Sequence, residues 1–359
     1  MHSVRSIPAT TRALVVRQAA KKSKPVYHDA TIEEKPIPSL KDGEVLVKIN
    51  AAAFNHRDVR SLSHIMIYGA GIVVASSKGS DELLNKRVFL VPMRGWENDP
   101  ESPESPQGIG ILGGGARPPI GTFSEYVAVE RDQVILSPAH LDDVHVAAWP
   151  LGGVTSWRAV AINARVEIGH NVLITGIGGG VALLSLQLCL AKGSNVYVTS
   201  SSETKISQAV ALGASGGVNY KHSKVLSSLE KLLKANGQTS LNSVIDSGGD
   251  DIARKLNKIL KQGGRIVCYG MTGNPQISFS MREVLKNHQL IGSTMGSHQD
   301  LIDGTRFIAE HGIVPVVSHV FDGLDGAEEG FELMNRGGQF GKIVIRLQHS
   351  DSDSVSAKL

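Results

Sequence analysis

The stretch that decides the fold reads Val172-Leu173-Ile174-Thr175-Gly176-Ile177-Gly178-Gly179-Gly180-Val181-Ala182. Its apolar start predicts a buried strand, and its glycine cluster predicts a turn that opens a helix. Such a turn lets the backbone approach a pyrophosphate closely, and the amides and positive dipole of the helix start favour phosphate charge. We therefore predict a dinucleotide site rather than a glycine-rich turn without a ligand. The predicted cofactor contacts in this stretch are Gly176, Gly178, Gly179, Gly180 and Val181.

Strands and helices alternate around this motif, which predicts a parallel sheet with helices on both faces. The expected strands are 171–175, 195–199, 243–246, 265–269 and 290–293. The expected helices are 142–148, 154–163, 181–191, 202–212, 225–235, 250–260 and 300–310.

The first third of the chain has a sequence pattern typical of strands and loops rather than of alternating strands and helices. Residues 13–16 and 44–49 read as strands, 99–119 as a long Pro-, Gly- and Ser-rich loop, and 121–129 as another strand. Two late strands, 316–320 and 342–346, are expected to rejoin this β-rich part. The predicted domains are 12–140, completed by 300–347, and 141–299, followed by a polar tail over 348–359.

Composition narrows the function classes. The 359 residues suggest two domains, and a net charge of +3 is too small to indicate nucleic acid or anionic membrane as a partner. The two cysteines allow neither a disulfide framework nor a thiolate zinc site, and they suit a reducing compartment. Residues 1–11 contain no apolar run of signal-peptide length, and the longest apolar stretches of the chain are too short to span a membrane. We expect a cytoplasmic protein, with a peroxisomal address as the alternative because the C-terminal Ala357-Lys358-Leu359 approximates that signal.

The choice of dinucleotide depends on the residues after the second predicted strand. They read Thr199-Ser200-Ser201-Ser202-Glu203-Thr204-Lys205. An NAD enzyme usually places an acidic residue at the strand end to hold the ribose hydroxyls, whereas hydroxyls and a lysine suit a ribose 2′-phosphate. Glu203 lies beyond the strand end but is evidence for the other cofactor. The segment favours NADP(H) and leaves NAD(H) as the alternative.

Several segments together resemble one enzyme family. The chain is similar over residues 12–347 to medium-chain dehydrogenases/reductases of the quinone oxidoreductase and zinc-type alcohol dehydrogenase-like branch. The resemblance implies a GroES-like catalytic domain, a Rossmann domain, a small-molecule substrate held against the nicotinamide, and a homodimer joined at the Rossmann sheet edges. The segments that carry it are 51–58, 121–126, 151–158, the glycine stretch, 263–267 and 341–344.

The same resemblance implies roles for individual residues. It places Ser201, Lys205 and Tyr220 near the adenosine phosphate, and Thr155, Gly270 and Met295 near the nicotinamide. It also makes Lys342, in the closing strand, a candidate cofactor contact.

Zinc is not expected. Where zinc members of the family carry a catalytic cysteine, this chain has Asn55, and no closely spaced cysteine quartet exists for a structural metal. Cys189 and Cys268 lie in apolar stretches and read as core residues. Asn55 is then the candidate donor to a developing oxyanion, and His56 is a weaker candidate proton donor.

One departure from the family affects function. Only residues 60–67 stand between the Asn-His-Arg-Asp-Val segment and the next strand, where relatives have a longer loop and helix. We predict an NADP(H)-dependent oxidoreductase that reduces activated carbonyls, enones or quinones, or oxidises alcohols, without zinc. The alternative is a pseudoenzyme that binds NADPH as a sensor, with a substrate cleft impaired by the shortened segment.

Overall fold

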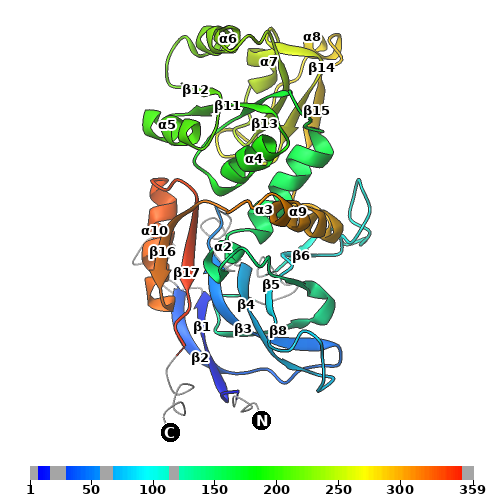
Figure 1. The fold of residues 1–359 in the computed structure, drawn as a ribbon, viewed down its shortest axis with the longest axis vertical. Helices are drawn as coiled ribbons and strands as arrows, with labels where there is room; N and C mark the ends of the chain where they lie inside the picture. The colour runs from blue at the N-terminus through cyan, green and yellow to red at the C-terminus, as the bar shows by residue number, and fades with distance from the viewer. Residues whose placement is uncertain (1–6, 17–29, 57–67, 113–120, 350–359) are drawn as a thin grey trace. The chain divides into compact units, whose positions relative to one another are not determined.

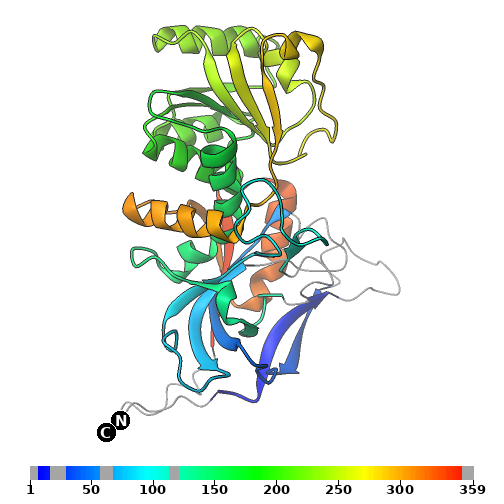
Figure 2. The ribbon, with the colours of Figure 1, turned by 90° about the vertical axis from the view of Figure 1, so that its right-hand side faces the viewer.

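The computed structural model describes residues 7–16, 30–56, 68–112 and 121–349. The chain divides into two compact units (Figures 1 and 2). The first unit consists of Met1–Pro150 and Val317–Leu359, and the second is Leu151–Val316. Residues 141–150, predicted for the Rossmann domain, thus belong to the first unit, and residues 300–316, predicted for the GroES-like domain, belong to the second. The limits of the family domains stay a prediction. Among the described residues, no helix combines the length and apolarity needed to cross a membrane.

The second unit is built on a six-stranded sheet in the order β12-β11-β10-β13-β14-β15, with all neighbouring strands parallel. The strand order reverses between β10 and β13, and ligands of open α/β sheets bind outside the carboxyl ends of the strands at such a reversal. This arrangement confirms the predicted doubly wound Rossmann sheet. Its strands are β10 (Asn171–Ile174), β11 (Asn195–Ser200), β12 (Gly216–Asn219), β13 (Leu241–Asp246), β14 (Leu260–Cys268) and β15 (Gln289–Gly292).

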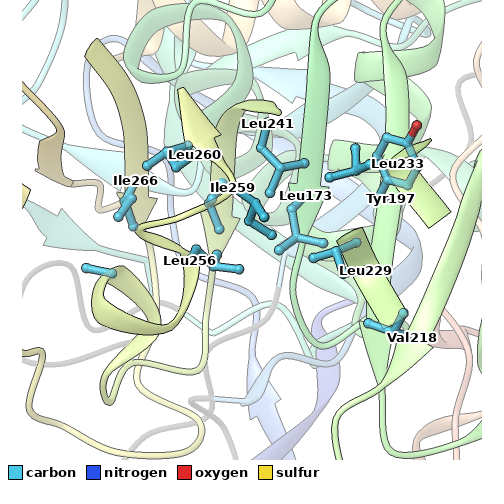
Figure 3. Packing of buried hydrophobic residues seen from close by; sticks show 12 residues of the cluster. Leu173, Tyr197, Val218, Leu229, Leu233, Leu241, Leu256, Ile259, Leu260 and Ile266 are labelled. Atoms are coloured by element: carbon cyan, nitrogen blue, oxygen red, sulfur yellow. The ribbon is translucent and has the colours of Figure 1, made fainter. Parts of the chain in front are cut away.

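Helices cover this sheet on both faces, which is why all four residues of β10 are buried. On one face, Leu229 and Leu233 of α6 pack with Leu173 of β10 and Tyr197 of β11 in a closed apolar cluster (Figure 3). Figure 2 shows α4 and α5, in green, on the other side of the sheet from α6. The helices of the unit are α3 (Pro150–Trp157), the π-helix η3 (Arg158–Asn163), α4 (Gly180–Ala191), α5 (Glu203–Ala211), α6 (Val225–Ala235), α7 (Ile252–Leu256), α8 (Met281–Val284) and α9 (His298–Glu310).

Two helix predictions need correction. The helix expected over 250–260 was wrong in extent, because the helix runs only from Ile252 to Leu256. The carbonyl oxygen of Ile259 accepts the backbone N–H of Leu241 at 2.7 Å, so this segment already pairs with β13 as β14 begins. The helix expected over 154–163 starts earlier, at Pro150, whose missing N–H is tolerated in the first helical turn.

The first unit contains a seven-stranded sheet in the order β16-β17-β3-β4-β5-β9. The seventh strand, β8, pairs with residues 44–48 of β3, and β17 pairs with residues 51–53. This sheet confirms the predicted GroES-like β domain. The late strand β17 pairs with β3, so this sheet combines strands from both ends of the chain. Its other described elements are the strand pairs β1–β2 and β6–β7, the helices α2 and α10, and two short 3₁₀ turns. The strands are β1 (Thr10–Val16), β2 (Ala30–Pro36), β3 (Glu44–Ala53), β4 (Tyr68–Ser76), β5 (Arg87–Leu90), β6 (Met93–Arg94), β7 (Gly110–Ile111), β8 (Tyr126–Glu130), β9 (Val134–Leu136), β16 (Val317–Asp322) and β17 (Lys342–Arg346), and the helices are α2 (Asp143–Ala147) and α10 (Ala327–Arg336).

A carboxylate organises part of the segment that was predicted as a long loop. The side chain of Glu104 accepts the backbone N–H groups of Glu97 at 2.7 Å and of Asn98 and Asp99 at 2.6 Å each. These hydrogen bonds, the one from Asn98 first, lower the pKa of Glu104 to about 2 because they stabilise its charged form. Hydrogen bonds to one carboxylate therefore hold residues 97–99 against Glu104.

Candidate functional site

The glycine loop, residues 176–180, follows β10 at the carboxyl edge of the sheet, where the strand order reverses. Gly176 and Gly178 have φ of +65° and +123°, backbone conformations that side chains rarely adopt. The N–H of Ile177 donates to the Thr199 carbonyl at 2.8 Å, which holds the loop against β11. Helix α4 starts at an N-cap glycine, Gly179, that offers no side-chain cap. The amides of its first turn thus donate to no capping side chain, and an anion can accept from them.

Lys205 lies against this loop. A Cβ atom built on Gly178 would stand 2.7 Å from Cδ and 3.4 Å from Nζ of Lys205. Partial burial of the ammonium lowers the pKa of Lys205. The structure therefore brings together two predicted cofactor residues and places the Lys205 side chain against the glycine loop.

The serine run after β11 is engaged with its own backbone. The Ser202 hydroxyl caps α5 by accepting the Lys205 N–H at 3.3 Å, and Ser201 accepts the side-chain N–H of Asn219 through its carbonyl at 3.3 Å. Asn219 also donates to Glu203 Oε1 at 2.9 Å. Glu203, the residue that argued for NAD(H), is thus directed towards the end of β12. Tyr220, which follows β12, is 53% exposed.

A buried carboxylate connects the two strands at the reversal point, and the sequence reasoning missed it. Asp246, 1% exposed at the end of β13, accepts the Thr175 hydroxyl at 2.6 Å and the Gly249 N–H at 2.8 Å. Thr175 in turn accepts the Ser247 N–H at 3.2 Å. Asp246 therefore fixes the loops after β10 and β13 against each other. The only signal in the sequence was an acidic residue at the end of an apolar strand.

Two of the three residues assigned to the nicotinamide lie together in the second unit. The Thr155 hydroxyl donates to the Leu151 carbonyl at 2.8 Å and lies 3.9 Å from Sδ of Met295. Both residues are buried, and Met295 has a φ of +54°, unusual for a residue with a side chain. Gly270 follows β14, and a Cβ built there would meet the Ser247 side chain at 3.3 Å. Gly270 therefore lies beside the loop that Asp246 fixes.

A buried ion pair supports the Thr155 and Met295 segments. Arg158 begins the π-helix η3 and donates to Asp300 Oδ2 at 2.9 Å. Asp300 also accepts the N–H of Ser297 at 3.0 Å, and its own N–H donates to the Ser297 hydroxyl at 3.0 Å. This capping box begins at Ser297, the residue after Gly296, and starts α9 at His298. The pair thus ties the end of α3 to the segment after β15.

The first unit contains Asn55 and Lys342, and it brings them together. Lys342 Nζ donates to Asn55 Oδ1 and to the Phe54 carbonyl, both at 2.6 Å, and the two side chains are buried. Asn55 Nδ2 donates to the Ala53 carbonyl at 3.1 Å. An ammonium on Oδ1 fixes the amide orientation, so Nδ2 is the donor end of Asn55.

Aromatic packing of the neighbouring Phe54 fixes the backbone next to Asn55. The ring of Phe54 lies 5.0 Å from the ring centroids of Phe123 and of Phe331, in edge-to-face contacts. A Cβ on Gly330 of α10 would stand 2.3 Å from the Phe54 ring, so α10 can approach this ring only with glycine there. The turn after β3 is therefore anchored one residue before Asn55.

His56 is exposed at the end of this turn. The shortened segment lies outside the described residues, as does Asp58. In the part of the chain that the structure describes, no three His, Cys, Asp or Glu side chains gather as ligands for a metal ion. Cys189 is buried in α4 and Cys268 is half-buried on β14, and burial raises the pKa of each thiol to about 12.

Comparison with known proteins identifies the family. A model described as an alcohol dehydrogenase GroES-like domain matches residues 41–139, and one described as a zinc-binding dehydrogenase matches 180–310. The zinc-type alcohol dehydrogenase-like protein YogA of Leptosphaeria maculans is 39% identical over 356 residues, which cover 93% of this chain and 99% of that protein.

Two more distant proteins agree with that match. The quinone oxidoreductase of Sus scrofa is 26% identical over 323 residues, covering 87% of this chain and 91% of that protein. The crystal structure of an NAD-dependent alcohol dehydrogenase superposes with a TM-score of 0.82 at 28% identity, covering 94% of this chain and 100% of that one. The chain belongs to the medium-chain dehydrogenase/reductase superfamily, in the zinc-type alcohol dehydrogenase-like and quinone oxidoreductase branch, and is an NAD(P)-dependent oxidoreductase.

Proposed function

We propose that this protein uses NADP(H) to reduce small activated carbonyl compounds, enones or quinones, or to oxidise the corresponding alcohols, without zinc. The contact of Lys205 with Gly178 carries the proposal. A 2′-phosphate would pair with a lysine ammonium at the glycine loop, whereas the 2′-hydroxyl of NADH carries no charge to pair with it. The nicotinamide, when bound, supplies or accepts the hydride.

The acidic residue that would oppose this choice is occupied elsewhere. Glu203 accepts a hydrogen bond from Asn219 and lies 3.8 Å from His222 Nε2. The similar alcohol dehydrogenase described above is NAD-dependent, so family membership leaves the choice of cofactor to local side chains. The hydroxyls of Ser201 and Ser202 and the exposed ring of Tyr220 flank the same end of the sheet.

Asn55 is the proposed donor to the oxygen that gains charge during hydride transfer. Lys342 holds the amide in the orientation that presents Nδ2 as the donor, and its positive charge favours a nearby oxyanion. Phe54, fixed between two aromatic rings, prevents the turn from shifting. In this proposal Asn55 contacts the substrate, Lys342 positions Asn55, and Thr155 contacts the nicotinamide.

The donor set supports a reaction without zinc. A catalytic zinc needs three protein ligands, commonly including a thiolate. The chain has two cysteines, and burial keeps both thiols protonated. Asn55 stands where zinc members of the family have a cysteine. A metal assay of the purified protein that found one zinc per chain would contradict this part of the proposal.

Cofactor titration of the full chain tests the central claim. We expect NADPH to bind more tightly than NADH, and Lys205→Gln to weaken NADPH by about 10- to 100-fold, since a hydrogen bond to a charged group contributes roughly 1.5–3 kcal/mol. NADH affinity should change little. Lys231→Gln removes an exposed charge on α6 and is the matched control. Equal loss for both cofactors would place Lys205 on the pyrophosphate, and no loss would remove the basis for NADP(H).

Turnover separates an enzyme from an NADPH sensor. Consumption of NADPH should be followed with a panel of quinones, enones and aldehydes, together with the Asn55→Ala variant. We expect Asn55→Ala to lower kcat by roughly 100-fold or more while NADPH affinity is retained, as for loss of an oxyanion donor. Tight NADPH binding with no turnover of any substrate in the panel would favour the sensor.

A homodimer joined along β15 is the proposed assembly. This strand forms one edge of the six-stranded sheet, and apolar side chains are exposed on it and just before it. Leu290 is 38% and Leu285 79% exposed. Pairing of two such edges would satisfy their backbone groups and cover these side chains. Light scattering should give a dimer mass for the native chain and a lower mass for Leu290→Asp; an unchanged dimer would place the interface elsewhere.

A further inference from the structure

A basic pocket lies at the end of the second unit's sheet opposite the glycine loop. His170 immediately precedes β10 and Gly176 comes two residues after it, so the two sites stand at opposite ends of one strand. The pocket has a volume of about 290 Å³. It is formed where the chain after η3 meets the first residues of β13 and β14, and is lined by Ala164, Arg165, Glu167, His170, Asn242, Lys261, Gly263 and Arg265.

Positive charge dominates this lining. The lining contains three cations, Arg165, Lys261 and Arg265, and one carboxylate, that of Glu167. Glu167 lies 3.9 Å from the His170 ring, and its side chain is 76% exposed. Within the described ranges, none of the three cations forms an ion pair with an acidic side chain.

The cations also act on one another and on the histidine. Burial, with Arg165 as the second cause, lowers the pKa of Arg265, and burial with Lys261 lowers the pKa of His170. An anion in the pocket would relieve the repulsion between cations that adds to both shifts. Arg165 adopts a φ of +49°, a strained conformation for a residue with a side chain.

Neutral donors complete the lining. Nδ1 of His170 accepts the Glu167 N–H at 3.2 Å, so the proton of the neutral ring is on Nε2, a donor that lies 3.9 Å from Glu167 Oε2. Oδ1 of Asn242 accepts the Asn171 N–H at 2.9 Å, which directs its NH₂ group the other way. Arg265 donates from Nη1 to the Asn163 carbonyl at 2.8 Å. That bond lies at the end of η3 and gives Arg265 a structural role, whereas no such role follows from it for Arg165 or Lys261.

We propose that this pocket binds a phosphate group, either free phosphate or the phosphate of a small polar monoester, at a site separate from the cofactor. Planar guanidinium groups match phosphate oxygens in pairs, and a lysine adds a point charge. The volume exceeds that of a phosphate group, which leaves room for a small organic part. The polar lining suits a hydroxylated one.

Calorimetric titration of the full chain tests this site. NADPH is kept saturating so that added phosphate does not compete at the glycine loop, and sodium chloride keeps the ionic strength constant. The probes are inorganic phosphate and glycerol 3-phosphate. We expect saturable binding of at least one of them; tighter binding of glycerol 3-phosphate indicates an ester ligand, and tighter binding of phosphate indicates the free ion.

Two variants remove charge with little effect on packing. Lys261→Gln changes an exposed side chain, and Arg165→Asn keeps a residue that tolerates positive φ. Each should weaken binding about fivefold or more, and Lys231→Gln on α6 should not. Heat that does not saturate, or equal affinity in all four proteins, would overturn the proposal by showing general ionic effects only.

Discussion

Helices α4 and α9 begin in the same unit, and their first turns are treated in opposite ways. At the start of α9, Ser297 and Asp300 form a capping box, and Arg158 pairs with the Asp300 carboxylate. At the start of α4, Gly179 provides no side-chain cap, and the preceding Gly176 and Gly178 adopt positive φ. The chain itself completes the start of α9, whereas the start of α4 has no side-chain cap, and that is where we propose that the cofactor's phosphates bind.

The segment ordered by Glu104 belongs with α9 in this comparison. Three backbone N–H groups there are bound by a carboxylate of the same chain. The difference teaches that exposed amides alone do not identify a binding site in this molecule. What distinguishes the glycine loop is that the helix it opens has no side-chain cap, together with a lysine that lies against the loop.

The largest effect is expected where the internal acceptor is buried. Asp300→Ala leaves the Arg158 guanidinium, which is 6% exposed, without its carboxylate and also removes the cap of α9. Breaking a buried pair from one side costs about 3–5 kcal/mol. Chemical denaturation should show this loss in the free energy of unfolding.

A neighbouring pair offers the matched control. Asp303→Ala removes an exposed partner of Arg306 on the same helix, and we expect a loss of about 1 kcal/mol or less. The double variant Arg158→Met with Asp300→Met should recover much of the stability, because neither charge is then buried alone. Equal losses for Asp300→Ala and Asp303→Ala would show that the buried pair is not a structural anchor.

The second effect concerns binding rather than folding. Gly178→Ala places a side chain at φ +123° and against Lys205, so the loop must shift and its amides move. Such strain costs about 1–3 kcal/mol, which corresponds to roughly 10- to 100-fold weaker NADPH binding when the loop relaxes away from the bound geometry. Fluorescence titration with NADPH measures it.

Gly237→Ala is the control for this variant. Gly237 has a φ of +70° after α6, and no atom lies within 4 Å of an added Cβ. The alanine variant therefore introduces backbone strain without a contact to Lys205. It should lower stability and leave NADPH affinity intact. Comparable NADPH affinity in both variants would contradict the assignment of the glycine loop.

The smallest effect is expected at Glu104. Its folded-state pKa of about 2 lies below the ordinary value of 4.5, so its contribution is present above pH 4.5 and is lost as the pH falls towards 2. Glu104→Gln should raise the hydrogen exchange of the Glu97, Asn98 and Asp99 amides at neutral pH. It should also remove their sensitivity to acid in this range. Unchanged exchange in the variant would mean that other contacts order the segment.

Sequence patterns predicted the elements whose signal is local. The apolar run and glycines around residue 174 gave β10 and α4 to within one residue, and 342–346 matched β17. Strand β12 was missed because Gly216 and Gly217 have low strand propensity, and pairing with β11 determines their geometry. Helix α10 was also missed, although it is amphipathic.

The candidate site was predicted as single residues, not as contacts. The sequence named Asn55 and Lys342 separately, but they are 287 positions apart, and only the pairing of β17 with β3 brings them together. Arg158 and Asp300 are 142 positions apart, and neither was recognised as part of a pair. Long-range partners of this kind depend on tertiary packing, which periodicity and local propensity do not encode.

The pairing of β17 with β3 has a consequence for biosynthesis. A ribosome makes Glu44–Ala53 early and Lys342–Arg346 only after the whole of Leu151–Val316 has been translated. The uninterrupted second unit can fold while the chain is still emerging, whereas the first sheet waits with an open strand edge for its last partner. Nascent chains stalled before residue 342 should therefore be the forms that most need chaperone protection.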